Sequence, residues 1–592
     1  MKRLFARLIA ATATGVSMAL TLPPYDLGGL VWLVLVPLLI ALWSLTGKRS
    51  GRVGFALGWL AGGVYFLISL HWISVVSGVG WVLLSLYLGG FIGVWGAFAA
   101  KWANPWRVRE SEGSPIERRI REKTTSEESH WRKSMRSLRI AFSVAALWCG
   151  LEWLRGWLFT GFGWNPLATA FHDTPVMAQS ADLIGLCGLS FVPLFLQAVV
   201  VQTGRRLFEE ARAGKLRPRI DFGVAALLIA LCFCYGVWRL QSVGKGESVR
   251  LKALLVQLNI PQDAARRLWT PEDIHLGYED ETKLGLERVA REDEQRFRDA
   301  EEGDEVELRR PDWVMWPESS LTGRLLMADD GRWATYQENL ITMERVWDEG
   351  DFELVMGLNE IEGEFMGDAP VMKSEARVWN SLTIFDPEGG VESYRKKHLV
   401  IFGEYIPLVE SLPFLKRIYE QQSGAEFGGS FSRGESVEPM MVEIDGEQVG
   451  LIPTVCFEDT VPRLMRKFVR GGPQLIVNVT NDGWFKESPA AAQHYANCKF
   501  RAIELRRPML RCANSGVSAA VTPTGTSAHP DTGKPQEIRD ENGSHFTRGS
   551  MLAEVEIPMQ PTLSLYALIG DWGVILLGVA GVVSGLRGRR RA

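Results

Sequence analysis

The sequence predicts a multi-span α-helical membrane domain joined to an α/β domain outside the membrane. Apolar segments recur up to residue 245 and once more near the C-terminus, with roughly the 20-residue length that a helix needs to cross about 30 Å of hydrocarbon. Between residues 246 and 560, short β-rich runs alternate with charged helical stretches. We therefore expect three regions, at 1–245, 246–560 and 561–592.

Seven of the expected spans precede residue 245, and the eighth lies near the end of the chain. Lys and Arg gather in alternate connections, such as Lys48, Arg49 and Arg52, whereas the connections between them, such as PPYDLGG, have neither. Because basic connections stay in the cytoplasm, this pattern places both termini there and residues 246–560 on the other side. The expected spans are 5–22, 27–46, 53–74, 80–100, 139–158, 181–203, 221–240 and 563–586.

Three features of the membrane domain have alternative interpretations. The first span, with basic residues ahead of an apolar run, also fits a cleaved signal peptide. The insert at 101–139 is expected to be a solvated cytoplasmic loop whose basic excess can touch anionic lipid head groups. Glu152 and Arg155 lie three residues apart on one helical face, so they either pair inside the membrane or reach the interface at the helix end.

The composition argues against several classes of function. A formal net charge of −4 gives no reason to expect a nucleic-acid partner. The seven cysteines include no CxxC pair, so the sequence indicates neither a disulfide framework nor a zinc site. We therefore expect no bound metal.

The region outside the membrane reads as one α/β domain. The runs VRLKALLVQLNI, DWVMWPE, ELVMGL, NSLTIFD, VGLIPTVC and QLIVNVTND are expected strands, and 272–299 and 459–470 are expected helical stretches. Strands that alternate with helices predict sheets covered by helices.

Three expected strand ends carry reactive side chains. Glu318 follows DWVMWP, the pair Lys396 and Lys397 follows GGVESYR, and Cys456 ends VGLIPTVC. A carboxylate can take the proton of a thiol, and an ammonium can stabilise both the thiolate and the oxyanion formed when it attacks. Cys456 taken alone would more often be an inert core thiol, and the acidic Glu458 two residues later disfavours a thiolate.

Longer motifs carry a resemblance to a known family. WPES, YRKKHL and the strand ending in Cys456 resemble the Glu-Lys-Cys signature of the nitrilase (carbon–nitrogen hydrolase) superfamily, which implies an α-β-β-α sandwich. LPPYDLGGLVWLVLVPLL, EWLRGWLFTGFGW, VQLNIPQ, HLVIFGEYIPL, NDGWF and RAIELRRPMLRCANSGVSA resemble the apolipoprotein N-acyltransferase family. The similarity runs from residue 20 to 585 and is interrupted chiefly by the 101–139 insert.

The resemblance implies a role for each matching residue, and none for Lys397. Cys456 is the implied nucleophile, Glu318 the general base and Lys396 the group that stabilises negative charge. The implied supporting residues are Glu404 and Glu458. The implied substrate-binding residues are Trp269 and Trp484. Glu404 and Glu458 are expected to orient Lys396 by charge-assisted hydrogen bonds and to position the incoming amine.

The implied reaction transfers an acyl chain from a membrane phospholipid, through a cysteine thioester, to the N-terminal amine of the diacylglyceryl-cysteine of an apolipoprotein. It requires no cofactor. The implied location is the bacterial inner (cytoplasmic) membrane, with a multi-pass chain and a periplasmic catalytic domain.

Two rival functions stay open. A membrane-tethered amidase or nitrilase-type hydrolase could use the same triad, although one span would suffice to tether it. The other rival is a transporter or lipid-binding scaffold with an inactive extracytoplasmic domain. Such a protein would be expected to have lost the Glu, Lys and Cys of the motif, and they are intact here.

Overall fold

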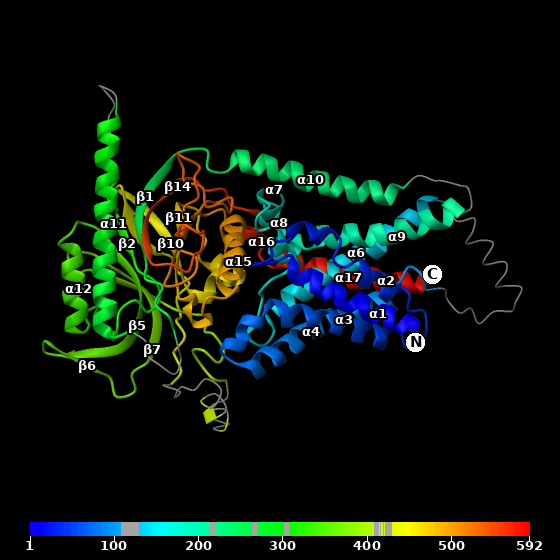
Figure 1. Cartoon of the computed structure of the whole chain (residues 1–592), viewed down its shortest axis with the longest axis horizontal. Helices are drawn as coiled ribbons and strands as arrows, with labels where there is room; N and C mark the ends of the chain where they lie inside the picture. The colour runs from blue at the N-terminus through cyan, green and yellow to red at the C-terminus, as the bar shows by residue number, and fades with distance from the viewer. Residues whose placement is uncertain are drawn as a thin grey trace, which may run out of the picture. The chain divides into compact units, whose positions relative to one another are not determined.

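The computed structural model describes residues 1–107, 130–212, 219–262, 269–300, 307–407, 414, 416–417, 420 and 429–591. Most of the expected basic insert lies outside these ranges. The chain forms two compact units (Figure 1). The helical unit comprises Met1–Ser74, Gly78–Gln241 and Leu568–Ala592, and the α/β unit comprises Val75–Ser77 and Ser242–Ala567.

The helical unit contains, among the described residues, five helices long and apolar enough to cross a membrane. A bent pair, α8 (Ala181–Leu189) and α9 (Phe191–Arg212), meets at 55° and provides a sixth span if the pair counts as one. The five single helices are α1 (Lys2–Leu20), α3 (Ser50–Ser69), α4 (Gly78–Lys101), α6 (His130–Arg155) and α10 (Ile220–Ser242).

The second and eighth expected spans correspond to shorter apolar helices. The expected span at 27–46 divides into a 3₁₀ turn at Gly28–Trp32 and α2 (Val36–Trp43), which has a proline in its first turn. Proline has no N–H to continue a preceding helix, so the chain restarts there. Near the C-terminus, α16 (Leu565–Ile569) stops before α17 (Trp572–Arg591), with Gly570 at φ +57° between them.

Glycines allow α3 and α4 to pack with their backbones in contact. A Cβ on Gly58 would lie 2.4 Å from the carbonyl oxygen of Ile92, and one on Gly62 would lie 2.8 Å from the Cα of Gly89. Neither position can hold a side chain without moving the helices apart. Small residues at this spacing are typical of helix pairs that associate in membranes.

The α/β unit contains a nine-stranded and a five-stranded sheet among the described residues. The larger has the order β14 (Gly549–Pro558), β1 (Ser248–Gln257), β2 (Trp313–Met315), β5 (Glu353–Met366), β3 (Arg324–Ala328) and β4 (Trp333–Ala334). Beside this path, β6 (Ala369–Met372) and β7 (Val378–Phe385) pair with β5, and β8 (Val391–Arg395) pairs with β7. The smaller has the order β13 (Ala519–Val521), β12 (Met509–Ala513), β11 (Gln474–Thr480), β10 (Glu447–Val455) and β9 (Met440–Ile444).

Alternation along the strands explains how the layers form. In β1, Leu251 and Leu255 belong to a core shared with residues of β10 and β11, whereas Leu254 and Val256 belong to a second core. Neighbouring residues of a strand point to opposite faces of its sheet, so one face meets the smaller sheet and the other meets helices. The second core includes Tyr278 of α11 (Pro271–Asp299) and Met343 of α12 (Gln337–Trp347).

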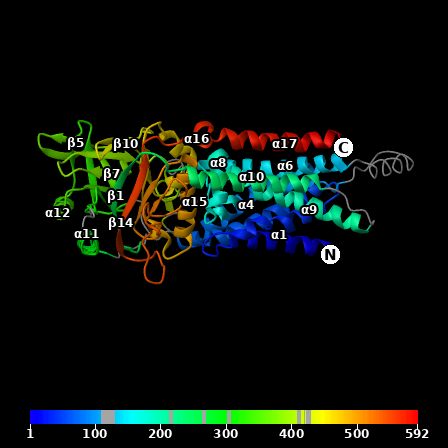
Figure 2. The same ribbon diagram turned by 90° about the horizontal axis from the view of Figure 1, so that it is seen from above.

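The layers of the α/β unit follow the order helices, sheet, sheet, helix. Figures 1 and 2 show α11 and α12 on one side, the two sheets in the middle and α15 (Ala490–Leu505) on the other side. This is the expected α-β-β-α sandwich. The expected strands correspond to β1, β2, β5, β7, β10 and β11.

The two expected helical stretches differ in outcome. The stretch at 272–299 is α11, whose Thr270 caps the helix in a reciprocal hydrogen-bond pair with Asp273. The stretch at 459–470 is not one helix: it holds the end of a 3₁₀ turn at Cys456–Thr460, then α14 (Pro462–Met465) and a 3₁₀ turn at Arg466–Phe468.

Candidate active site

Cys456 stands at the sharp turn that ends β10. Its φ is +55°, a conformation that residues other than glycine rarely adopt, and a 3₁₀ turn at Cys456–Thr460 begins there. The carbonyl oxygen of Cys456 accepts a hydrogen bond from Asn478 Nδ2 at 3.2 Å. The side chain is partly buried and forms no disulfide. An outlying backbone conformation held by its surroundings is typical of functional positions.

Glu318 follows β2 and is 6% exposed. Its backbone passes close to Gly357 of β5, where a Cβ would lie 2.5 Å from the Glu318 Cα, so the neighbouring strand needs glycine at this point. Glu318 Oε1 accepts a hydrogen bond from Asn380 Nδ2 at 2.7 Å. Oε2 is buried and has no hydrogen-bond partner among the described residues.

Lys396 follows β8 and is 1% exposed. Its Nζ lies 2.9 Å from Glu404 Oε1 and 3.8 Å from Glu318 Oε1. Burial would lower the pKa of Lys396, but the negative charges of Glu404 and Glu318 raise it above its ordinary value. Lys396 therefore carries a permanent positive charge between two carboxylates.

The ionisation of the thiol and of its neighbour follows from this environment. Burial and the charge of Glu318 raise the pKa of Cys456 well above its ordinary value, and Lys396 opposes them. Burial also raises the pKa of Glu318, again opposed by the charge of Lys396. Cys456 is therefore a thiol at neutral pH, and it becomes a nucleophile only if its proton is taken away during the reaction.

Glu458 was expected to hydrogen-bond the Lys396 ammonium, but it does not. It holds the backbone on both sides of the site instead. Oε1 accepts hydrogen bonds from the N–H groups of Lys397 and His398, both at 2.8 Å, and Oε2 accepts one from Val455 at 3.0 Å. Tyr394 Oη donates to the same carboxylate at 3.0 Å. Burial raises the pKa of Glu458 to about 7, although the charge of Lys396 opposes this.

A buried group of four charged side chains includes Asp459, which lies in the turn Cys456–Thr460. His494 on α15 contacts Asp459 through Nε2 and Asp482 through Nδ1, both at 2.7 Å. Arg511 of β12 contacts Asp482 at 3.0 Å and Asp459 at 3.5 Å. Burial would lower the pKa of His494, but the charges of Asp459 and Asp482 raise it to about 9. This group ties the turn at Cys456 to α15, to β12 and to the segment that follows β11.

The two candidate substrate-binding tryptophans differ in their surroundings. Trp269 packs against the core between the larger sheet and its helices, close to Gly277 of α11. Trp484 stands in the 3₁₀ turn Asp482–Phe485 and is 46% exposed. Trp484 is thus exposed and Trp269 packs against a core, and substrate binding by either residue stays a prediction.

Asn380 and Tyr394 are the site residues that sequence reasoning missed. Both lie inside strands, where side chains are usually assigned to the core. For Asn380, the only signal was a polar residue in a buried β-rich run.

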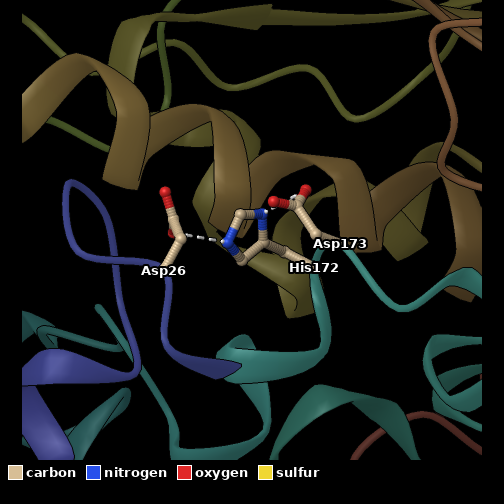
Figure 3. A group of neighbouring side chains, drawn as sticks. All are labelled: Asp26, His172 and Asp173. Atoms are coloured by element: carbon tan, nitrogen blue, oxygen red, sulfur yellow. Dashed lines mark hydrogen bonds and ion pairs between the residues drawn. The ribbon is translucent and has the colours of Figure 1, made fainter. Parts of the chain in front are cut away.

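The helical unit also contains a group of potential metal ligands, Asp26, His172 and Asp173, whose ligand atoms lie within 4.8 Å of one another. His172 Nε2 lies 3.0 Å from Asp26, and Nδ1 lies 2.9 Å from Asp173. Figure 3 shows the two carboxylates on opposite sides of the imidazole ring. The imidazole of His172 therefore bridges carboxylates from two connections.

Both units match known families. Residues 14–199 match the family model described as the apolipoprotein N-acyltransferase N-terminal domain, and residues 310–553 match the one described as carbon–nitrogen hydrolase. Among solved structures, an amidase from Nesterenkonia sp. is similar at 16% identity with a TM-score of 0.29, covering 55% of this chain and 94% of that one.

Curated relatives match almost the whole chain. The apolipoprotein N-acyltransferase of Geobacter metallireducens is 28% identical over 525 residues, which cover 87% of this chain and 85% of the relative. That of Allorhizobium ampelinum is 30% identical over 531 residues, covering 88% and 86%. This chain, a membrane protein with a carbon–nitrogen hydrolase domain, belongs to the apolipoprotein N-acyltransferase family.

Proposed function

We propose that this chain transfers an acyl chain from a membrane phospholipid to the N-terminal amine of the diacylglyceryl-cysteine of an apolipoprotein. The observation that carries the proposal is the buried ammonium of Lys396, which lies between Glu404 and Glu318 and whose charge acts on Cys456. In this proposal Cys456 is the nucleophile and Glu318 the general base. Family membership supplies the substrates.

The first step forms a thioester. Glu318 takes the proton of the Cys456 thiol, and the sulfur attacks the carbonyl carbon of a phospholipid ester. The Lys396 ammonium stabilises the negative charge that develops on the carbonyl oxygen. When the C–O bond breaks, the leaving oxygen takes the proton from Glu318 and departs as the hydroxyl of a lysophospholipid.

The second step transfers the acyl chain to nitrogen. The acceptor amine attacks the thioester carbonyl and gives a proton to Glu318, the C–S bond breaks, and the proton passes to the Cys456 sulfur. An amide is formed and the enzyme returns to its starting state. Water competes with the amine for the thioester, so transfer requires a site that excludes water.

The membrane location of both substrates agrees with the apolar helices of the helical unit. From family membership, we place the chain in the bacterial inner membrane. The alternation of basic connections puts the α/β unit on the side opposite the cytoplasm, which is then the periplasm. A reporter that is active only outside the cytoplasm should be active when fused after residue 245 and inactive when fused within 101–139. The opposite result at either fusion site would overturn this orientation.

Complementation tests the function itself. The chain should restore growth and N-acylated lipoproteins in a bacterium depleted of its own apolipoprotein N-acyltransferase, and Cys456→Ala should not. A purified enzyme that releases free fatty acid but transfers none to a diacylglyceryl-cysteine peptide would instead be a hydrolase.

A further inference from the structure

Asn380 contacts the proposed base and two residues beside it. It lies on β7 and is 5% exposed. Its carbonyl oxygen accepts a hydrogen bond from the Lys396 N–H at 2.8 Å. Its Nδ2 donates to Glu318 Oε1 at 2.7 Å and to Glu404 Oε1 at 2.8 Å. One residue thus holds the backbone of the lysine and both neighbouring carboxylates.

The two acids determine how the Asn380 amide is oriented. Ionised carboxylates only accept hydrogen bonds, so the NH₂ group has to face them. A flipped amide would place its oxygen against two carboxylate oxygens. In the observed orientation Oδ1 is buried and has no hydrogen-bond partner among the described residues. Asn380 therefore leaves its own acceptor unpaired while it supplies donors to Glu318 and Glu404, which is unusual for a residue that serves only the packing of a strand.

We propose that Asn380 is a positioning residue for thioester formation, holding Glu318 ionised and aligned to receive the proton of Cys456. This inference rests on the function proposed above. The shortest contact of Glu318 is with Asn380, at 2.7 Å, whereas the Lys396 ammonium is 3.8 Å away and closer to Glu404. The Asn380 amide is therefore a close hydrogen-bond donor that can orient the proposed base.

The hydrogen bond also bears on the protonation of Glu318. Burial raises the pKa of Glu318, and the Asn380 amide is one of the groups that lower it. Without the amide, the charged form loses a donor and the carboxyl retains its proton to a higher pH. A protonated Glu318 cannot accept the thiol proton. Without the Asn380 amide, thioester formation should therefore begin to slow at a higher pH as the solution is made more acidic.

Three variants of the full-length protein in detergent micelles separate this role from a structural one. Asn380→Ala removes both donors. Asn380→Asp keeps the shape and can donate only one proton, and only when its new carboxyl is protonated. Ser381→Ala is the matched control, because Ser381 is the next residue of the same strand, fully buried, and hydrogen-bonded to Glu360.

The measurement is the rate of thioester formation at Cys456 from a phospholipid with a labelled acyl chain, in a single turnover, from about pH 5 to about pH 9. We expect Asn380→Ala to be about tenfold slower or more at neutral pH, with the midpoint of its acid limb moved upward by roughly one pH unit. For Asn380→Asp, the rate relative to wild type should fall as the pH rises. Ser381→Ala should retain the wild-type midpoint.

If the acid limb of Asn380→Ala has the wild-type midpoint, the inference is overturned, whether or not thioester formation is slower. If Asn380→Ala does not fold, Asn380→Asp decides: a constant rate ratio to wild type across the pH range would contradict the proposed role. A wild-type protein that forms no thioester at any pH would mean that the proposed function itself has failed.

Discussion

Lys396 and Glu404 form a buried ion pair, with Nζ 2.9 Å from Oε1. Glu318 is also near the ammonium, but at 3.8 Å. Glu404 thus takes the closer contact with the lysine and leaves the Glu318 carboxylate available to act as a base. The charge of Glu404 also raises the pKa of Glu318, because like charges disfavour ionisation.

Glu404→Gln should therefore change both the rate and its pH dependence. We expect turnover to fall by roughly ten- to a hundredfold, because Lys396 loses its nearest counter-charge and can move towards Glu318. The acid limb of thioester formation should move to lower pH, since Glu318 loses a neighbouring negative charge. A pH series of single-turnover rates checks both. If Glu404→Gln turns over at the wild-type rate with an unchanged acid limb, Glu404 has only a structural role.

The two adjacent lysines should behave differently. Lys396→Ala should lose most activity, because the buried ammonium that stabilises negative charge is removed. Lys397→Ala should remain active, because its Nζ donates instead to the carbonyl oxygen of Glu435. Both variants are compared in the transfer assay at equal expression. The reverse order of activities would assign the charge-stabilising role to Lys397.

Glu458→Gln should lower both stability and turnover. The carboxylate accepts hydrogen bonds from three backbone N–H groups and from Tyr394. A glutamine has only one acceptor oxygen, and its NH₂ group would face N–H or O–H donors. Each buried donor left without an acceptor costs about 1–3 kcal/mol of stability. Thermal unfolding in detergent should show a lower Tm than for Tyr394→Phe, which loses only one donor. Equal Tm values for wild type and Glu458→Gln would contradict this account of Glu458.

Alkaline pH should destabilise the α/β unit through His494. Its pKa in the folded protein is about 9, against 6.5 for an ordinary histidine. When the pKa of a histidine is raised by folding, its full contribution to stability is present at a pH below the pKa of the unfolded state. That contribution is lost as the pH rises from 6.5 through 9. The rise corresponds to roughly 3 kcal/mol. We expect the Tm of wild type to fall over this interval and the Tm of His494→Gln to be lower but flatter. Parallel curves for the two proteins would show that His494 does not titrate there.

Local patterns predicted the parts of the site that stand at strand ends. Glu318 and Cys456 stand at the ends of apolar runs and Lys396 follows the run GGVESYR, and such runs can be located without knowledge of the fold. Asn380 could not be found in this way, because its role depends on the pairing of β7 with β8, which sets its carbonyl oxygen opposite the Lys396 N–H.

The hydrogen-bond partners of Glu458 could not be predicted from the sequence because they depend on a turn. The positive φ of Cys456 starts a tight turn that directs the Glu458 carboxylate back to the backbone of β10 and to the residues after Lys396. His494 lies 35 residues from its partner Asp459, so only the tertiary structure brings the two together. The second and eighth expected spans are shorter in the structure because hydropathy does not report where a helix breaks, as it does before Pro37 and near Gly570.

The central claim is that Cys456 carries the acyl chain, and the mass of the acylated protein tests it most directly. Of the other thiols of the α/β unit, Cys498 and Cys512 are fully buried, and burial raises the pKa of Cys512 to about 12. After incubation with phospholipid, wild type should gain the mass of one acyl chain on the peptide that contains Cys456. Hydroxylamine should remove it, and Cys456→Ala should gain none. Acylation at another residue, or transfer to the acceptor peptide by Cys456→Ala, would contradict the account.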